Sequence, residues 1–273
     1  MATQRKPVRL NRTQRTAVTT LHRYALDARS RRPVLGDQHA GTVLAGLQQP
    51  SWRRALNRAD APLVAARARR IDERAAQFLA EHPGGLVLNL AAGLDSRVHR
   101  VDPPSSADWV DLDLPDVVAL RRQHCAQHEN ARAIAASPLD EGWWADVPRD
   151  RPALVIAEAL LPHLPGAQVH ALLDRITGRL PRGRIVCDVV SPWVRALGAV
   201  AGLRWSLAHL DEIGGRHRQL VLRESVDLPA LAEQEDLPAP LRGINRAAAA
   251  IPELANAVRL LHYGFGAGQA PGT

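Results

Sequence analysis

The sequence predicts an α/β fold in which helices cover one mostly parallel sheet. Between residues 84 and 190, short apolar segments alternate with helical segments about every 25 residues. The first apolar segment, Leu86–Leu90, follows two glycines and precedes small residues, which is typical of a buried strand entering a tight turn. Acidic residues stand at or just beyond successive segment ends, so in a parallel sheet they would meet at one edge. They are Asp95, Asp113, Asp140 and Glu158.

The composition excludes several classes of protein. No run of about 18 uncharged apolar residues occurs and the basic N-terminus lacks an apolar core, so we expect a cytoplasmic chain without membrane span or signal peptide. The net charge of +7 comes almost entirely from scattered arginines, and only 4% of residues are aromatic. An anionic small molecule is therefore a better partner than nucleic acid. Cys125 and Cys187 lie far apart without a metal-ligand pattern, so free buried thiols and no metal site are expected.

The N-terminal third is expected to be helical. Residues 1–12 are polar and basic and are predicted to form a disordered tail. Residues 13–82 are predicted to form a helical cap beside the sheet, because apolar residues recur at helical spacing and Asp37 and Pro62 provide helix starts. The predicted helices span 13–29, 38–47 and 62–79.

Residues 83–191 are expected to form the core of the sheet. The predicted strands span 86–90, 107–112, 131–136, 153–158 and 183–190. The predicted helices between them span 96–101, 115–128 and 166–180. This alternation requires right-handed crossover connections, so the strands are expected to be parallel.

Residues 192–211 break the alternation. They are apolar and rich in small residues, with Trp193, Trp205 and two arginines, so a core helix and a lid insertion over a pocket both stay open. Residues 212–266 are expected to complete the same domain. Their predicted strands span 218–226 and 258–265, and their predicted helices span 229–236 and 241–257.

Five short motifs follow one another in the order of a known family. They are Arg32-Pro33-Val34-Leu35-Gly36-Asp37, Arg67-Ala68-Arg69-Arg70-Ile71-Asp72, Asn89-Leu90-Ala91-Ala92-Gly93-Leu94-Asp95-Ser96-Arg97, Asp113-Leu114-Pro115 with Leu120-Arg121, and Ala157-Glu158-Ala159-Leu160-Leu161. Together they resemble the leucine carboxyl methyltransferase family, and most closely its bacterial branch, from about Thr13 to Phe265.

The resemblance implies an S-adenosylmethionine-dependent O-methyltransferase with a class I, Rossmann-like sheet whose last strand is antiparallel. Arg67 would bind the carboxylate of the cofactor's methionine part, Glu158 would face its ammonium group, and Asp113 would accept both ribose hydroxyls. Gly93 would let the chain pass close to the cofactor, and the turn at 137–140 would flank the adenine. The cofactor-binding residues implied in this way are Arg67, Ala91, Gly93, Asp95, Asp113, Leu114, Ser137, Leu139, Asp140, Glu158 and Ala159.

The sequence departs from the family pattern at four positions. Ala91 and Ala159 stand where the family usually has glycine, Ser96 where it has threonine, and His163 where it has tyrosine. The methyl group of Ala91 would narrow the approach to the cofactor but leaves conformers with negative φ available, so weakened binding is expected.

The acceptor is expected to be a small acidic or aromatic molecule, of polyketide type by analogy with the bacterial branch. A carboxylic acid arrives ionised and needs no base, whereas a phenol benefits from one. His163, just beyond the fourth predicted strand, is the candidate base for a phenol, and a polar pocket wall is the alternative role. Arg23 or Arg204 is expected to attract an anionic acceptor, and Trp193 and Trp205 are further candidate substrate residues. A homodimer is compatible with the sequence.

Three other functions are weighed against this one. A protein that binds S-adenosylmethionine without transferring methyl, such as a rearrangement or cyclisation enzyme, is suggested by Ala91 and Ala159. A nicotinamide-dependent oxidoreductase is disfavoured because the turn after the first strand lacks the three-glycine fingerprint. An RNA methyltransferase is disfavoured by the scattered charge.

Overall fold

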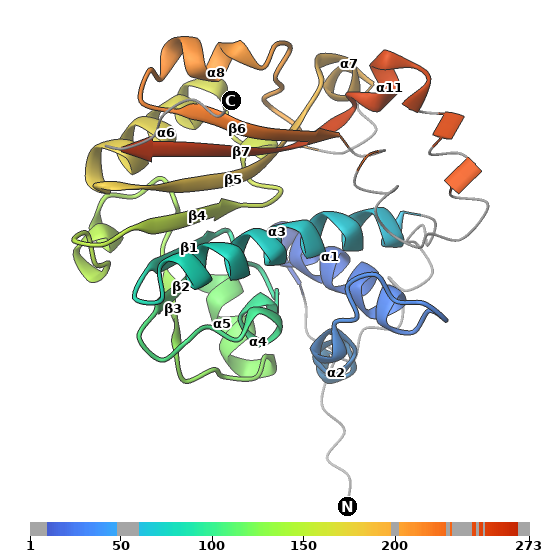
Figure 1. Cartoon of the computed structure of the whole chain (residues 1–273). Helices are drawn as coiled ribbons and strands as arrows, with labels where there is room; N and C mark the ends of the chain where they lie inside the picture. Colours follow the sequence, from blue (N-terminus) through green and yellow to red (C-terminus); the bar gives the residue numbers. More distant parts are fainter. Residues whose placement is uncertain are drawn as a thin grey trace, which may run out of the picture.

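The computed structural model describes residues 10–47, 60–197, 202–227, 230, 242–243, 246–247 and 249–266. Within these residues, strands form one sheet in the order β3-β2-β1-β4-β5-β7-β6 (Figure 1). They are β1 Leu86–Leu90, β2 Asp108–Asp113, β3 Ala131–Ala135, β4 Ala153–Ala157, β5 Arg182–Val190, β6 Val221–Asp227 and β7 Val258–Gly266. Strands β1 to β5 pair in parallel, and β7 lies antiparallel between β5 and β6. The predicted α/β class, with a mostly parallel sheet and an antiparallel last strand, is confirmed.

Helices lie on both faces of the sheet and at the carboxyl ends of its parallel strands. They are α1 Arg12–Ala28, α2 Gln38–Leu47, α3 Ala61–Glu81, α4 Arg97–Val101, α5 Pro115–His124, η2 Gly142–Asp146, η3 Leu161–His163, α6 Gly166–Arg179, α7 Pro192–Ala196, α8 Asp211–Arg216 and α11 Pro252–Ala255. In Figure 1, α3 runs across one face while α1 and α2 gather beyond the strand ends. The three helices predicted before β1 are confirmed, each within two residues of its predicted ends.

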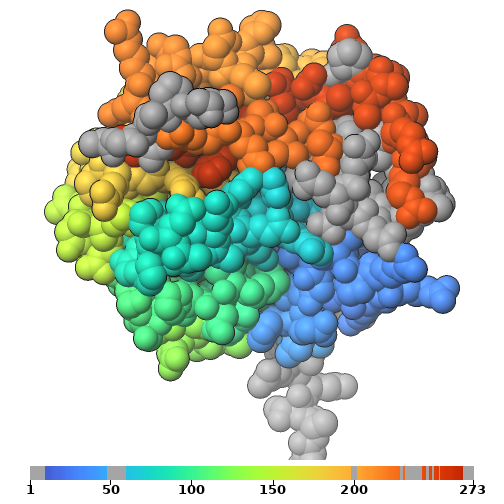
Figure 2. Space-filling view, viewed as in Figure 1, coloured from blue at the N-terminus to red at the C-terminus, as the bar shows by residue number. Residues whose placement is uncertain are grey.

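Each face of the sheet has its own apolar core. Leu86 and Leu88 of β1 belong to the core that α6 covers, whereas Val87 belongs to the core that α3 covers. Every residue of β1 and β4 is buried, which explains their almost uninterrupted apolar sequences. Figure 2 shows the outer side of α3 between the N-terminal helices and the C-terminal segments.

Helices α1, α2 and α3 pack together through a third apolar cluster beside the strand ends. Asn11 caps α1 by accepting a hydrogen bond from the backbone N–H of Gln14. Asp37 caps α2 by accepting hydrogen bonds from the backbone N–H groups of His39 and Ala40. These caps satisfy donors that a helix start leaves unpaired, so both helices have defined starts.

The described residues between 192 and 210 do not form one core helix. Helix α7 ends at Ala196, and after the gap at 198–201 the described chain is irregular up to α8. The backbone N–H groups of Arg204 and Trp205 donate to the carbonyl of Pro162, and that of Leu207 donates to Val190. This segment therefore crosses from η3 to the end of β5. The predicted tail 1–12, apart from residues 10–12, and the predicted helix 229–236, apart from residue 230, lie outside the described residues.

Candidate functional site

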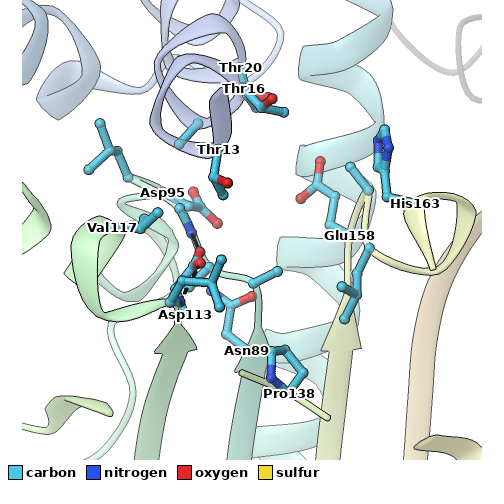
Figure 3. Close-up of a pocket in the computed structure, with 18 of the residues that line it drawn as sticks. Thr13, Thr16, Thr20, Asn89, Asp95, Asp113, Val117, Pro138, Glu158 and His163 are labelled. Carbon is cyan, nitrogen blue, oxygen red and sulfur yellow. Dashed lines mark hydrogen bonds between the residues drawn. The ribbon is translucent and has the colours of Figure 1, made fainter. Parts of the chain in front are cut away.

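A cavity of about 520 Å³ opens at the carboxyl ends of the parallel strands (Figure 3). One wall, called here the strand-end side, comprises Asn89, residues 91–95, Asp113, Leu114, Val117, residues 137–139, Glu158 and Ala159, with Arg67 and Arg97. The opposite wall, called the α1 side, comprises α1 residues together with Leu160, His163, Leu164, Gly202 and Arg204. Figure 3 shows Asp113 and Asn89 at the strand ends and the threonines of α1 across the cavity from them.

Two turns on the strand-end side have a left-handed backbone at alanine. Ala91, just after β1, has φ +53°, and Ala159, just after β4, has φ +52°. This conformation costs a non-glycine residue about 1–2 kcal/mol, because its Cβ approaches a carbonyl oxygen. The expectation that Ala91 uses negative φ is therefore wrong. The turns have a shape that glycine adopts freely, and this chain forms them with alanine.

Asp113 joins the turn after β1 to the end of β2. Its carboxylate accepts hydrogen bonds from the backbone N–H groups of Gly93 and Leu114, both at 2.7 Å. Burial raises the pKa of Asp113, and these two hydrogen bonds oppose the shift without cancelling it. Gly93 itself has φ +56°, and a Cβ on it would lie 3.3 Å from Cβ of Ala17, so its small size lets α1 approach this turn. The carboxylate keeps lone pairs for a ligand.

Glu158 is held by two arginines. Its Oε1 accepts from Nε of Arg67 at 3.0 Å, and its Oε2 accepts from Nη2 of Arg97 at 2.7 Å. Burial alone would raise the pKa of Glu158, but the two guanidiniums outweigh burial and lower it. Arg67 also donates to Asp188 of β5 at 3.1 Å, and the other oxygen of Asp188 accepts the backbone N–H of Ala159. The carboxylate of Glu158 is therefore ionised and fixed beside the turn after β4.

Arg97 is the most enclosed member of this ionic network, with a side chain only 1% exposed. It pairs with Asp72 at 2.5 Å and with Asp95 at 2.6 Å, besides Glu158. Burial disfavours its charge, but these carboxylates hold its pKa well above the ordinary value. In all, five carboxylates share three guanidiniums, so the network has an excess of acidic groups. The members are Asp37, Asp72, Asp95, Glu158, Asp188, Arg67, Arg97 and Arg100.

The α1 side presents hydroxyl groups to the cavity. Thr13, Thr16 and Thr20 stand at helical spacing on one face of α1 (Figure 3). The hydroxyl of Thr16 donates to the carbonyl of Arg12 at 3.3 Å, which leaves its oxygen free to accept. Within the described residues the hydroxyls of Thr13 and Thr20 have no hydrogen-bond partner, so this face can bind a polar ligand.

His163 lies at the end of η3 with one ring nitrogen fixed. Its Nδ1 is 3.1 Å from the carbonyl oxygen of Gly202. A carbonyl oxygen only accepts, so Nδ1 carries the hydrogen, and in the neutral ring Nε2 keeps a free lone pair. His163 lines the cavity, so this second nitrogen is the one available for chemistry.

The structure gathers most of the predicted site residues around this cavity. Those that line it are Arg67, Ala91, Gly93, Asp95, Asp113, Leu114, Ser137, Leu139, Glu158, Ala159, His163 and Arg204. Asp140 does not line it but accepts the backbone N–H of Ser137 at 3.1 Å, so it shapes the turn.

Three predicted substrate residues also lie outside the lining. Arg23 donates to both carboxylate oxygens of Asp60, at 2.9 and 2.6 Å. The indole of Trp193 donates to the carbonyl of Glu253 at 2.8 Å. Trp205 packs against the start of α6, where a Cβ on Gly166 would lie 3.1 Å from its ring. The structure therefore places these three predicted side chains outside the cavity lining, each in a contact with another part of the chain.

Sequence reasoning missed several lining residues and their supports. They are Arg12, Thr13, Thr16, Thr20, Tyr24, Asn89, Arg97 and Asp188. The sequence does contain an indication for Asp188, because a carboxylate inside the apolar strand 185–190 would be buried and would need a partner. No sequence pattern indicates the role of Thr13, Thr16 and Thr20, because helical spacing does not reveal which polar face of α1 lines a cavity.

Other kinds of site are absent from the part of the chain that the structure describes. No group of three or more His, Cys, Asp or Glu side chains there is arranged to hold a metal ion. None of the helices searched there combines the length and apolar character needed to cross a membrane. Cys125 is half-buried and Cys187 is buried, and both are free thiols.

Comparison with known proteins agrees with this geometry. Residues 32–177 match the model of the leucine carboxyl methyltransferase family. Tetracenomycin polyketide synthesis O-methyltransferase TcmP of Streptomyces glaucescens is 38% identical over 271 residues, which cover 94% of this chain and 98% of that protein. The S-adenosyl-L-methionine-dependent methyltransferase dpfgK of Gibberella zeae is 37% identical over 185 residues, which cover 62% of each chain.

Solved structures share the fold. A chain from Thermobifida fusca YX has a TM-score of 0.55 at 17% identity, covering 90% of this chain and 94% of that one. Magnesium protoporphyrin IX methyltransferase of Synechocystis PCC 6803, solved with S-adenosylhomocysteine, has a TM-score of 0.50 at 14% identity, covering 79% and 93%. The chain therefore belongs to the leucine carboxyl methyltransferase family and is an S-adenosylmethionine-dependent methyltransferase.

Proposed function

We propose that this protein transfers methyl to an oxygen of a small aromatic acceptor of polyketide type, either a phenol or a carboxylic acid. The single observation that carries the proposal is one continuous cavity with two different walls. Its strand-end side has the charges and turns that suit the cofactor, and its α1 side has hydroxyls, His163 and apolar residues that suit an acceptor. The similarity to TcmP over 94% of the chain supports a polyketide-type acceptor.

The strand-end residues fit S-adenosylmethionine. Asp113 keeps acceptor lone pairs that suit two ribose hydroxyls, because its present bonds come from only two backbone N–H groups. The acidic excess of the ionic network suits the cationic methionine part. Arg67 contacts Glu158 and Asp188, but each of its Nη atoms has a second hydrogen for the ligand carboxylate. When bound, the cofactor supplies an electrophilic sulfonium methyl group.

The protein's own contribution would be positioning and, for a phenol, removal of a proton. Holding the acceptor oxygen in line at roughly 3 Å supplies several kcal/mol of rate enhancement. His163 is oriented by Gly202, so its Nε2 can accept a phenolic proton while Nδ1–H stays bonded to the carbonyl. A carboxylate acceptor is already ionised at neutral pH and would not use this base.

A panel of phenols and aromatic carboxylic acids, incubated with S-adenosylmethionine, tests the proposal. Mass spectrometry identifies ether or ester products and quantifies S-adenosylhomocysteine. For a phenol we expect His163→Gln to lower kcat about 100-fold and to remove the base from the pH profile. For a carboxylic acid we expect a change below about threefold. The control is His209→Gln, an exposed histidine outside the lining.

A second candidate function has a specific observation in its favour. Ala91 and Ala159 both hold left-handed φ at the cofactor turns, so the chain retains strained turns where glycine would be relaxed. A protein that binds S-adenosylmethionine for a rearrangement or cyclisation would tolerate alanine in place of glycine at these two turns. Calorimetry separates the two functions, because tight binding of S-adenosylhomocysteine without methyl transfer to any oxygen acceptor would favour the second one.

A further inference from the structure

Four arginines line the cavity, and they fall into two classes. Arg67 and Arg97, on the strand-end side, have their guanidiniums taken up by buried carboxylates. Arg12 and Arg204, on the α1 side, are exposed, and no acidic side chain of the described residues pairs with either. A guanidinium without an acidic partner keeps its full charge for an anionic ligand, whereas the charge of a paired one is partly neutralised, although its remaining N–H groups can still donate.

Arg12 and Arg204 belong to the same wall of the cavity although they are far apart in the sequence. A Cβ on Gly202 would lie 3.0 Å from Nη2 of Arg12 and 3.7 Å from Nδ1 of His163. Arg204 is two residues further on, and its backbone N–H donates to Pro162 at 2.8 Å. The Arg12 guanidinium and the His163 imidazole therefore both lie beside Gly202, and Arg204, two residues further on, lines the same cavity. Figure 3 shows His163 and the threonines of α1 around this cavity.

From this arrangement we propose an anion-binding acceptor subsite, which deepens the proposed function and rests on it. The acceptor is an aromatic acid whose ionised carboxylate lies between Arg12 and Arg204. Its other oxygens hydrogen-bond to Thr13, Thr16 and Thr20. A carboxylate matches the fork of N–H donors that a guanidinium presents, and a planar ring system suits the apolar residues between the two walls.

The threonine face strengthens the inference, because it is independent of charge. Thr13 and Thr20 have no hydrogen-bond partner within the described residues, and Thr16 keeps its accepting lone pairs. Hydroxyls can both donate and accept, so they suit a molecule with several phenol or ketone oxygens. Together the two features select an acidic, oxygen-rich aromatic molecule over a neutral or cationic one.

The test measures binding alone, in protein saturated with S-adenosylhomocysteine, so its failure is distinct from a failure of methyl transfer. The probes are a hydroxynaphthoic acid and its carboxamide, which have similar shape and differ in charge. In Arg12→Gln with Arg204→Gln we expect the acid to bind at least about tenfold more weakly, and the carboxamide to change less than about twofold. Raising the salt concentration should weaken only the acid.

Arg182→Gln is the matched control, because Arg182 is exposed at the amino end of β5 and does not line the cavity. It should leave both affinities unchanged. Thermal unfolding of each variant checks that the fold is retained. The proposal is overturned if the unmodified protein binds the acid no better than the carboxamide, or if the double variant changes both affinities equally or neither.

Discussion

The two walls of the cavity are built in opposite ways. On the strand-end side, buried charges are bonded to one another, as Arg97 is to three carboxylates, and backbone turns are fixed by Asp113 and Asp188. On the α1 side, Arg12 and Arg204 are exposed and pair with no acidic side chain of the described residues, and the hydroxyls of Thr13 and Thr20 have no hydrogen-bond partner there. The first wall is preorganised before any ligand arrives, whereas the second has polar groups still to be satisfied.

This difference matches two binding tasks. A cofactor is the same molecule in every turnover, so a rigid, mutually paired set of charges can be fitted to it without a further ordering cost. Acceptors differ from one enzyme to another. Separate hydroxyl side chains on one helix face can be replaced one at a time, so each substitution can change which acceptor binds. We therefore expect substitutions on the strand-end side to cost stability or cofactor affinity, and those of Arg12, Arg204 and the cavity-facing threonines of α1 to change acceptor affinity only.

The largest effect should come from Arg97→Gln. Removing this guanidinium takes one partner from each of Asp72, Asp95 and Glu158. Arg100 and Arg67 remain, but the acidic excess of the buried network grows by one charge, which costs about 3–5 kcal/mol of unfolding free energy. Urea denaturation measures it. On the opposite wall, Arg204→Gln should change stability by less than about 0.5 kcal/mol. Similar losses in the two variants would contradict the contrast between paired and unpaired walls.

Asp113→Ala should weaken S-adenosylhomocysteine binding about 100-fold, measured by calorimetry. Two hydrogen bonds from a ligand to a charged acceptor are lost, each worth about 1.5–3 kcal/mol. The backbone N–H groups of Gly93 and Leu114 also lose their acceptor. Asp108→Ala, at the other end of β2, is the control and should retain full affinity. An unchanged affinity in Asp113→Ala would remove the cofactor role of the strand-end side.

The same carboxyl should make cofactor binding sensitive to acid. Burial raises the pKa of Asp113, so on acidification it gains its proton before an exposed aspartate does. The protonated form loses accepting capacity, so S-adenosylhomocysteine affinity should fall by about tenfold as the pH drops through this raised pKa. Asp113→Asn is uncharged at every pH and should lack this dependence. Parallel pH profiles in the two proteins would assign the dependence to another group.

The sequence predicted the strand-end side of the cavity better than the α1 side. Strand periodicity predicted the sheet, and the carboxyl ends of parallel strands share one edge, so Asp113 and Glu158 could be placed together from sequence. The positive φ angles of Ala91 and Ala159 could not be predicted from the sequence, because alanine favours negative φ and only the folded turn imposes the left-handed conformation. The threonine face depends on how α1 is rotated over the sheet edge, which tertiary packing determines.

Ala91→Gly should stabilise the fold modestly. Glycine relieves about 1–2 kcal/mol of strain from the positive φ in the folded state, but it also raises the conformational entropy of the unfolded chain, which offsets part of this gain. We expect the free energy of unfolding, measured by urea denaturation, to rise by up to about 1 kcal/mol. The control is Ala92→Gly, the buried neighbour whose φ is not positive, which should destabilise instead. A loss of stability in Ala91→Gly would mean that the alanine methyl makes contacts worth more than the strain.

Two neighbouring threonines distinguish the two faces of α1. Thr20 lines the cavity, whereas Thr19 points away and its hydroxyl donates to the carbonyl of Arg15 at 2.7 Å. Thr20→Val keeps the branched shape but removes the hydroxyl, so affinity for the hydroxynaphthoic acid should fall about two- to tenfold, equivalent to roughly 0.5–1.5 kcal/mol. Binding of S-adenosylhomocysteine should not change, because the strand-end side is untouched. Thr19→Val should leave both affinities unchanged, and a loss equal to that of Thr20→Val would attribute the effect to the helix rather than to the cavity-facing hydroxyl.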